Sequence, residues 1–318
     1  MSTRTPHDAL FKAVFSDPKN TAPHLAAVLP VALTEAVDLG QLELLPGSFV
    51  DDELADRHAD LLFRAPWRDD AWDDGDGSER VAPPVFFYLL FEHQSTVDTL
   101  MAWRILRYMV RIWEQWIADQ DSPPSQSLRL PAIFPLVVYQ GEQRWTASTE
   151  FFDLLAVPPA AHASLGPYLP SFRLALEQLA RTADEDIPGE GLGRLALLFL
   201  KNYRNEAIHQ LLREHADVLR RLLEDGDSGL SSLARLVQYV ILVNPMGEIA
   251  DVVDALAPLG TRAQETAVTL GERLREEGRK EGRKAGREEG RKAGREEGRE
   301  EGERATLAQS ILMVLRKR

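Results

Sequence analysis

Residues 85–94 read VFFYLLFEHQ, seven apolar or aromatic side chains followed by three polar ones. Valine, phenylalanine and tyrosine favour extended backbone, and an unbroken apolar run of this length is typical of a strand buried on both faces. Because side chains alternate along a strand, Glu92 and Gln94 point to one face of the sheet and His93 to the other. Burying a glutamate is costly unless it is paired or binds a metal. The stretch therefore predicts a central strand with a candidate site at its carboxyl end.

The elements around this strand predict an α/β fold. Apolar spacing indicates a short helix and two strands before it, and a helix and a strand after it, at residues 7–15, 42–50, 59–64, 98–117 and 132–139. The resulting order of helix, three strands, helix and strand (αβββαβ) is typical of a sheet covered by helices. Residues 171–270 carry apolar clusters at helical spacing without a convergent polar constellation, so we expect a helical C-terminal extension.

The composition excludes several classes of protein. The 318 residues include 37 Lys and Arg against 50 Asp and Glu, a net charge of -13, so any surface for a polyanion must be a local basic face. The absence of cysteine excludes disulfides, Cys-ligated zinc and thiol nucleophiles, and leaves metal binding to carboxylates or histidines. No signal-peptide core and no run of roughly 20 apolar residues is present, so we expect a soluble cytoplasmic protein that does not contact membranes.

The C-terminal part has its own pattern. We divide the chain into a core at 1–170, the helical extension at 171–270, a charged glycine-repeat segment at 271–305 and a short amphipathic basic tail at 306–318. From Gly278 to Gly302 a glycine recurs every fourth residue, seven in all. At roughly 1 kcal/mol of helix penalty each they cost about 7 kcal/mol, which charge pairs worth about 0.2–0.5 kcal/mol each do not recover. We expect a solvated, disordered linker in the monomer, or a helix that forms through self-association or on nucleic acid.

A second acid accompanies Glu92. Asp60 lies in the apolar run HADLLF at 58–63, which is the strand expected before the central one. Two carboxylates that end adjacent strands can chelate a hard divalent cation such as Mg²⁺, whose ligands are oxygen atoms. Such a cation polarises a phosphodiester and lowers the pKa of a water molecule. The alternative is that Glu92 is a strand-end carboxylate that faces solvent or an arginine.

Five blocks of sequence resemble a known family. They are HDALFKAVF at 7–15, GSFVDDELADRHADLLF at 47–63, FFYLLFEHQST at 86–96, WRILRYMVRIWE at 103–114 and PLVVYQGEQRW at 135–145. In this order they resemble the bacterial recombination-promoting nucleases, also labelled transposases, which belong to the PD-(D/E)XK, restriction-endonuclease-like group. The resemblance implies an αβββαβ core and a metal-dependent endodeoxyribonuclease that hydrolyses DNA phosphodiester bonds and promotes DNA recombination.

The resemblance also implies catalytic residues. The family's D…E-x-Q pattern falls on Asp60, Glu92 and Gln94, with Asp60 and Glu92 as ligands of Mg²⁺ or another divalent cation. The third position is usually lysine in the wider group. Gln94 can only orient the attacking water by hydrogen bonds, so we expect strong dependence on the metal. Glu53 and Asp8 are weaker candidates for a supporting carboxylate, and the alternatives for them are a loop acid and an acid in the first turn of a helix.

Other residues near this pattern have two interpretations each. Arg104, Arg107 and Arg111 share one face of the helix after the central strand, where they contact DNA phosphates or form a solvated, ion-paired face. His93 faces away from Glu92 and is expected to pack or to form hydrogen bonds, and His7 is similarly ambiguous.

Two other functions compete with a DNA nuclease. One is a catalytically silent DNA-binding or assembly module, and the other is an RNA-directed nuclease in phage defence. In each case the C-terminal segment could mediate a homo-oligomer.

Overall fold

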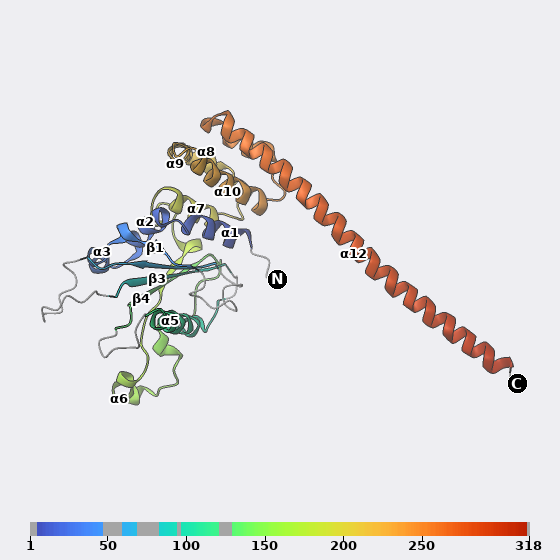
Figure 1. Ribbon diagram of the computed structural model, residues 1–318, viewed down its shortest axis with the longest axis horizontal. Coiled ribbons are helices and arrows are strands. Elements are labelled where there is room, and N and C mark those ends of the chain that lie inside the picture. The colour runs from blue at the N-terminus through green and yellow to red at the C-terminus, as the bar shows by residue number, and fades with distance from the viewer. Residues whose placement is uncertain (1–4, 47–58, 69–82, 94–96, 121–128, 317–318) are drawn as a thin grey trace.

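Figure 1 shows the protein as a computed structural model, which describes residues 5–46, 59–68, 83–93, 97–120 and 129–316. Two of the candidate residues named above, Glu53 and Gln94, lie outside the described residues. Within them, no helix combines the length and the apolar character needed to cross a membrane.

A five-stranded sheet forms the centre of the molecule. Its strands lie in chain order, as β1 (Glu43–Leu44), β2 (Ala59–Ala65), β3 (Val85–Glu92), β4 (Ile133–Tyr139) and β5 (Ala175–Gln178). The first three strands pair antiparallel, and β3, β4 and β5 pair parallel. Every residue of β3 is buried, as expected for a continuous apolar run at the middle of a sheet.

Helices cover both faces of this sheet (Figure 1). One face packs on α5 (Met101–Ala118), whose inward side buries Ile105, Tyr108 and Ile112. The opposite face packs on α1 (Pro6–Phe15) and α7 (Gly191–Lys201) in a core that continues into the later helices. Because side chains alternate along β3, this strand contributes apolar residues to the core under α5 and to the core under α1 and α7.

The remaining helices extend these layers. They are α2 (Pro18–Val28), α3 (Val31–Ala36), α6 (His162–Leu165), α8 (Gln210–Glu214), α9 (Ala216–Leu223), α10 (Asp227–Val243), α11 (Ile249–Ala255) and α12 (Thr261–Arg316). Short 3₁₀ turns lie at Leu39–Gln41, Phe151–Leu154, Pro159–Ala161, Gly166–Tyr168, Leu179–Arg181 and Ala257–Leu259.

The predicted α/β fold, an αβββαβ core with a helical C-terminal extension, is confirmed, and three details differ. The strand expected at 42–50 is only the two-residue β1 in its described part. Helices α2 and α3 and strand β5 were not expected, because α2 carries two prolines and β5 has only four residues. Since β5 joins the sheet beyond residue 170, the core and the extension share one hydrophobic interior.

The glycine-repeat segment also differs from the expectation of disorder, because it forms part of the continuous helix α12. The first turns of α12 bury Ala263, Ala267 and Leu270 against α10 and α11. Docking supplies the helix nucleus, after which each further residue adds a hydrogen bond at a much smaller entropic cost. Beyond the docked turns the helix projects away from the body (Figure 1), and a Cβ atom added at any glycine from Gly278 to Gly302 would meet nothing within 4 Å.

Candidate active site

Asp60 and Glu92 lie at the ends of two neighbouring strands, β2 and β3, and on the same face of the sheet. The antiparallel pairing of β2 with β3 sets Ala59 opposite Phe91 and Asp60 opposite Leu90, so the start of β2 meets the end of β3. Leu90 belongs to the core on α5, and alternation gives Asp60 and Glu92 the same direction. Two acids that are 32 positions apart in the chain are thus brought together next to α5.

Glu92 is buried and held by an arginine. Its side chain is 1% exposed, and its Oε2 accepts a hydrogen bond from Nη2 of Arg104 at 2.6 Å. Nη1 of Arg104 donates to Oδ2 of Asp98 at 3.0 Å. The ion pair compensates the cost of burying the Glu92 carboxylate. This contact is one of the two alternatives that the sequence leaves open for Glu92, and it orients the carboxylate on the α5 face.

Asp60 is in a different electrostatic position. Both of its carboxylate oxygens are buried, and neither forms a well-aligned hydrogen bond within the described residues, although the hydroxyls of Tyr88 and Tyr108 lie near it. Burial raises the pKa of the Asp60 carboxyl to about 7, although the Tyr88 hydroxyl and the charges of Arg104 and Lys12 lower it. Near neutral pH the ionised form of Asp60 therefore lacks a sufficient positive partner, which is the condition that a bound cation would relieve.

The carboxylate oxygens of Asp60 and Glu92 are the kind of ligand that a hard cation takes. Mg²⁺ is commonly bound through one or two carboxylates while it retains several waters or substrate oxygens, and Asp60 and Glu92 offer such a pair. Over the described part of the chain, no group of three or more His, Asp or Glu side chains is placed to hold a metal. A cation bound here would therefore take at most these two carboxylates from the described residues, and water or substrate oxygens would supply its other ligands.

Asp8, His7 and His93 form a separate polar cluster. Oδ1 of Asp8 lies 3.3 Å from Nδ1 of His93, and its Oδ2 accepts a hydrogen bond from the Thr5 hydroxyl at 2.8 Å. Nδ1 of His7 lies 2.9 Å from the Tyr239 hydroxyl. The bond from Asp8 raises the pKa of His93, whereas burial lowers the pKa of His7 to about 4. Asp8 thus completes the capping box of α1 with Thr5 and lies at ion-pair distance from His93, whose ring packs near those of Phe91 and His7.

The three arginines of α5 have different surroundings. Arg104 is engaged by Glu92 and Asp98, whereas Arg107 and Arg111 are exposed. Nη1 of Arg111 lies 3.2 Å from Oε2 of Glu114, and both side chains are more than half exposed. Only Arg107 and Arg111 therefore present their charge to solvent on the outer side of α5.

Comparison with known proteins agrees with this architecture. The family model described as "Putative transposase, YhgA-like" matches residues 5–229, which include all five strands and both acids. The chain belongs to this family. No solved structure gives a significant match.

Relatives of the YhgA-like family carry names that point to two outcomes. "Recombination-promoting nuclease RpnA" of Escherichia coli (strain K12) is 28% identical over 275 residues, covering 86% of this chain and 85% of the relative. "Recombination-promoting nuclease RpnD" of Escherichia coli O157:H7 is 27% identical over 277 residues, covering 87% and 96%. "Inactive recombination-promoting nuclease-like protein RpnE" of strain K12 is 27% identical over 278 residues, covering 87% and 84%. The relatives of this chain thus include proteins named as nucleases and at least one named as inactive.

Two tyrosines complete the site in this member of the YhgA-like family, and sequence reasoning missed them. The rings of Tyr88 and Tyr108 lie in a tilted arrangement with centroids 4.9 Å apart, and their buried hydroxyls lie near Asp60 without a well-aligned hydrogen bond within the described residues. Burial and the nearby Asp60 raise the pKa of Tyr108 to about 12, so it remains a proton donor. The signals were present: Tyr88 precedes Glu92 by four residues on one strand face, and Tyr108 follows Arg104 by one helical turn.

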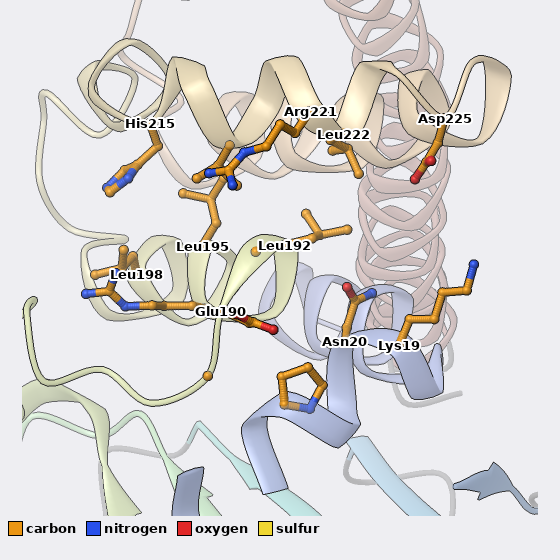
Figure 2. A pocket seen from close by; sticks show the side chains of 15 residues that line it. Lys19, Asn20, Glu190, Leu192, Leu195, Leu198, His215, Arg221, Leu222 and Asp225 are labelled. Carbon is orange, nitrogen blue, oxygen red and sulfur yellow. The ribbon is translucent and has the colours of Figure 1, made fainter. Parts of the chain in front are cut away.

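A cavity of about 590 Å³ lies elsewhere, between α2, α7 and α9 (Figure 2). Its lining carries three bases, Lys19, Arg194 and Arg221, and two acids, Glu190 and Asp225, so both signs of charge are present. It is on the face of the sheet opposite α5, and none of Asp60, Glu92 and Arg104 lines it. The buried acid pair is therefore the stronger candidate for the site of chemistry.

Proposed function

We propose that this protein is a metal-dependent endodeoxyribonuclease that hydrolyses DNA phosphodiester bonds and promotes DNA recombination. The observation that carries the proposal is that Asp60, at the start of β2, and Glu92, at the end of the neighbouring β3, lie on one face of the sheet, with both Asp60 oxygens buried and without a well-aligned hydrogen bond within the described residues. A structural acid would normally form such bonds, whereas a cation ligand needs oxygens directed at the ion. The names of RpnA and RpnD support the same reaction class.

Each residue has a defined role in this proposal. Asp60 and Glu92 bind the divalent cation, and Arg104 keeps the Glu92 carboxylate in place through the 2.6 Å contact. When bound, the cation would polarise the scissile phosphodiester and lower the pKa of the attacking water. Gln94, which has no charge, would orient that water through its amide. The Tyr88 and Tyr108 hydroxyls are donors available to oxygens in the site.

A catalytically silent DNA-binding module is the second candidate. The ion pair between Arg104 and Glu92 favours it, because the arginine occupies a position near the carboxylate that a cation would otherwise share. The name of RpnE favours it as well. The two candidates differ in one respect that can be measured, since only the first converts DNA.

The test is incubation of the purified full chain with supercoiled plasmid DNA, with Mg²⁺ or with excess EDTA, and in parallel with structured RNA. We expect nicked or linear plasmid with Mg²⁺, none with EDTA, and intact RNA. Binding of plasmid without cleavage would support the silent module. Degradation of RNA with intact plasmid would instead identify an RNA-directed nuclease.

A further inference from the structure

The outer side of α5 carries an apolar ridge. Trp103, Val110 and Ile117 are 48%, 41% and 37% exposed, and they recur every seventh residue. Seven residues are nearly two helical turns, so the three side chains follow one line along the helix. The opposite side of α5 is the side that packs on the sheet. The helix is therefore apolar on two sides, and the sheet covers only one of them.

The charges beside this α5 ridge are self-complementary. Arg107 lies between Trp103 and Val110, and Glu114 lies between Val110 and Ile117, each four residues after a ridge position. In an antiparallel helix pair, residues at this position of one helix face the same position of the other. Pairing two copies of α5 about the middle of the helix places Arg107 opposite Glu114 of the second copy, and Glu114 opposite Arg107 of the second copy. In a parallel pair this position would face a different heptad position of the second helix, so Arg107 and Glu114 would not meet.

We propose that the α5 ridge, formed by Trp103, Val110 and Ile117, is the interface of a two-fold symmetric homodimer in which two α5 helices pack antiparallel. The occupant is a second copy of this chain, because one helix supplies both the apolar line and the opposite charges that match it. DNA is a less suitable occupant, because its phosphates would bind Arg107 and Arg111 but would make no favourable contact with the apolar side chains of the ridge. Self-association through the glycine-repeat segment has less support, since its only apolar side chains between Leu274 and Leu307 are three alanines.

The proposed pairing has a geometric consequence. An 18-residue helix is about 27 Å long, so the contact is small and the dimer should dissociate on dilution. Arg104, which binds Glu92, is in the first turns of α5. Because the helices run in opposite directions, the dimer carries its two Asp60 and Glu92 pairs towards opposite ends of the helix pair.

The test is sedimentation velocity of the full chain over a wide range of concentration. We expect a monomer–dimer equilibrium that Val110→Lys weakens at least about tenfold, since the lysine buries a charge at the centre of the ridge. Val31→Lys is the matched control, because Val31 is 73% exposed on α3, and it should leave the equilibrium unchanged. A wild-type chain that stays monomeric, or a Val110→Lys chain that still forms the wild-type dimer, would overturn the proposal.

A charge exchange tests the direction of pairing. Arg107→Glu sets two glutamates against each other, and Glu114→Arg sets two arginines against each other, so each single change should weaken the dimer at least about tenfold. The double variant Arg107→Glu, Glu114→Arg restores opposite charges and should recover most of the wild-type affinity. Failure of the double variant to exceed either single variant would show that these residues do not face each other across a two-fold axis.

Discussion

At the scale of single residues, the proposed function depends on a carboxylate that the protein alone does not stabilise. In the described part of the structure Asp60 is buried with no well-aligned hydrogen bond and only tyrosine hydroxyls nearby, whereas Glu92 is held by Arg104. A protein gains no stability from such an acid. Glu92 therefore has a positively charged partner among the described residues and Asp60 does not. A cation-binding role for Asp60 would require this difference.

The cost of Asp60 should depend on pH. The pKa is raised from the ordinary 3.8 to about 7, so below about pH 4 the acid is protonated in both the folded and the unfolded state and costs nothing. As the pH rises to about 7, only the unfolded state releases the proton, and stability falls by about 4 kcal/mol. With EDTA present, Asp60→Asn should thus become more stable relative to wild type between about pH 4 and pH 8, measured by urea unfolding.

Two comparisons make this measurement decisive. Asp254→Asn removes an exposed carboxylate on α11 and should show no such pH-dependent gain. At about pH 8, Mg²⁺ should raise the melting temperature of wild type but not of Asp60→Asn, because ligand binding stabilises the folded state. Equal pH dependence of wild type and Asp60→Asn would contradict the assignment of the raised pKa to Asp60.

At the scale of secondary structure elements, α5 joins the candidate site to the surface. Its first turns bring Arg104 to Glu92, its inner side packs on the sheet, and its outer side presents Arg107 and Arg111. Since the chain as a whole carries a net charge of -13, contact with DNA needs a local basic face such as this one.

The contribution of α5 to DNA binding can be measured from the dependence of DNA affinity on salt concentration. Each lost phosphate contact reduces the slope of log affinity against log salt by about 0.9, so Arg107→Gln with Arg111→Gln should reduce it by up to about 2, measured at protein concentrations low enough that the α5 ridge is not covered by a second copy. Affinity should fall similarly for all DNA sequences. Arg220→Gln with Arg221→Gln on α9 is the control, because these exposed arginines lie on the other face of the sheet. An unchanged slope in the α5 variant would assign phosphate contacts to another surface.

Local patterns predicted much of this architecture, and contacts between distant elements account for what they missed. The alternation along the central strand correctly placed Glu92 and His93 on opposite faces of the sheet, because strand periodicity is a property of neighbouring residues. The contact of Glu92 with Arg104 depends on how α5 crosses the end of β3. Residue spacing in the sequence could not decide whether Glu92 faces solvent or an arginine. Strand β5 is too short to show a period, and it exists because β4 offers it an edge.

At the scale of the whole molecule, a compact body ends in a long projecting helix (Figure 1). The glycine penalty was estimated for an isolated segment, whereas α12 starts from docked turns at Ala263, Ala267 and Leu270. The local estimate therefore predicted the wrong state because it omitted a nucleus supplied by tertiary packing.

Removing the projecting part separates its role from that of the body. A chain that ends at Leu270 keeps the docked turns of α12, so it should retain its fold by circular dichroism and its Mg²⁺-dependent cleavage of plasmid. It should also retain the dimer formed through the α5 ridge. A shortened chain that is folded but strictly monomeric would show that the C-terminal segment mediates self-association, which is the alternative raised by the sequence.

The central claim is that Asp60 and Glu92 hold the cation that enables DNA cleavage. The most direct measurement is Mg²⁺-dependent plasmid cleavage by the full chain and by its Asp60→Ala, Glu92→Ala and Asp254→Ala variants, each shown to be folded by circular dichroism. The account predicts that the first two variants lose cleavage and that Asp254→Ala retains the wild-type rate. A folded Asp60→Ala chain that cleaves plasmid at the wild-type rate with Mg²⁺ would contradict it.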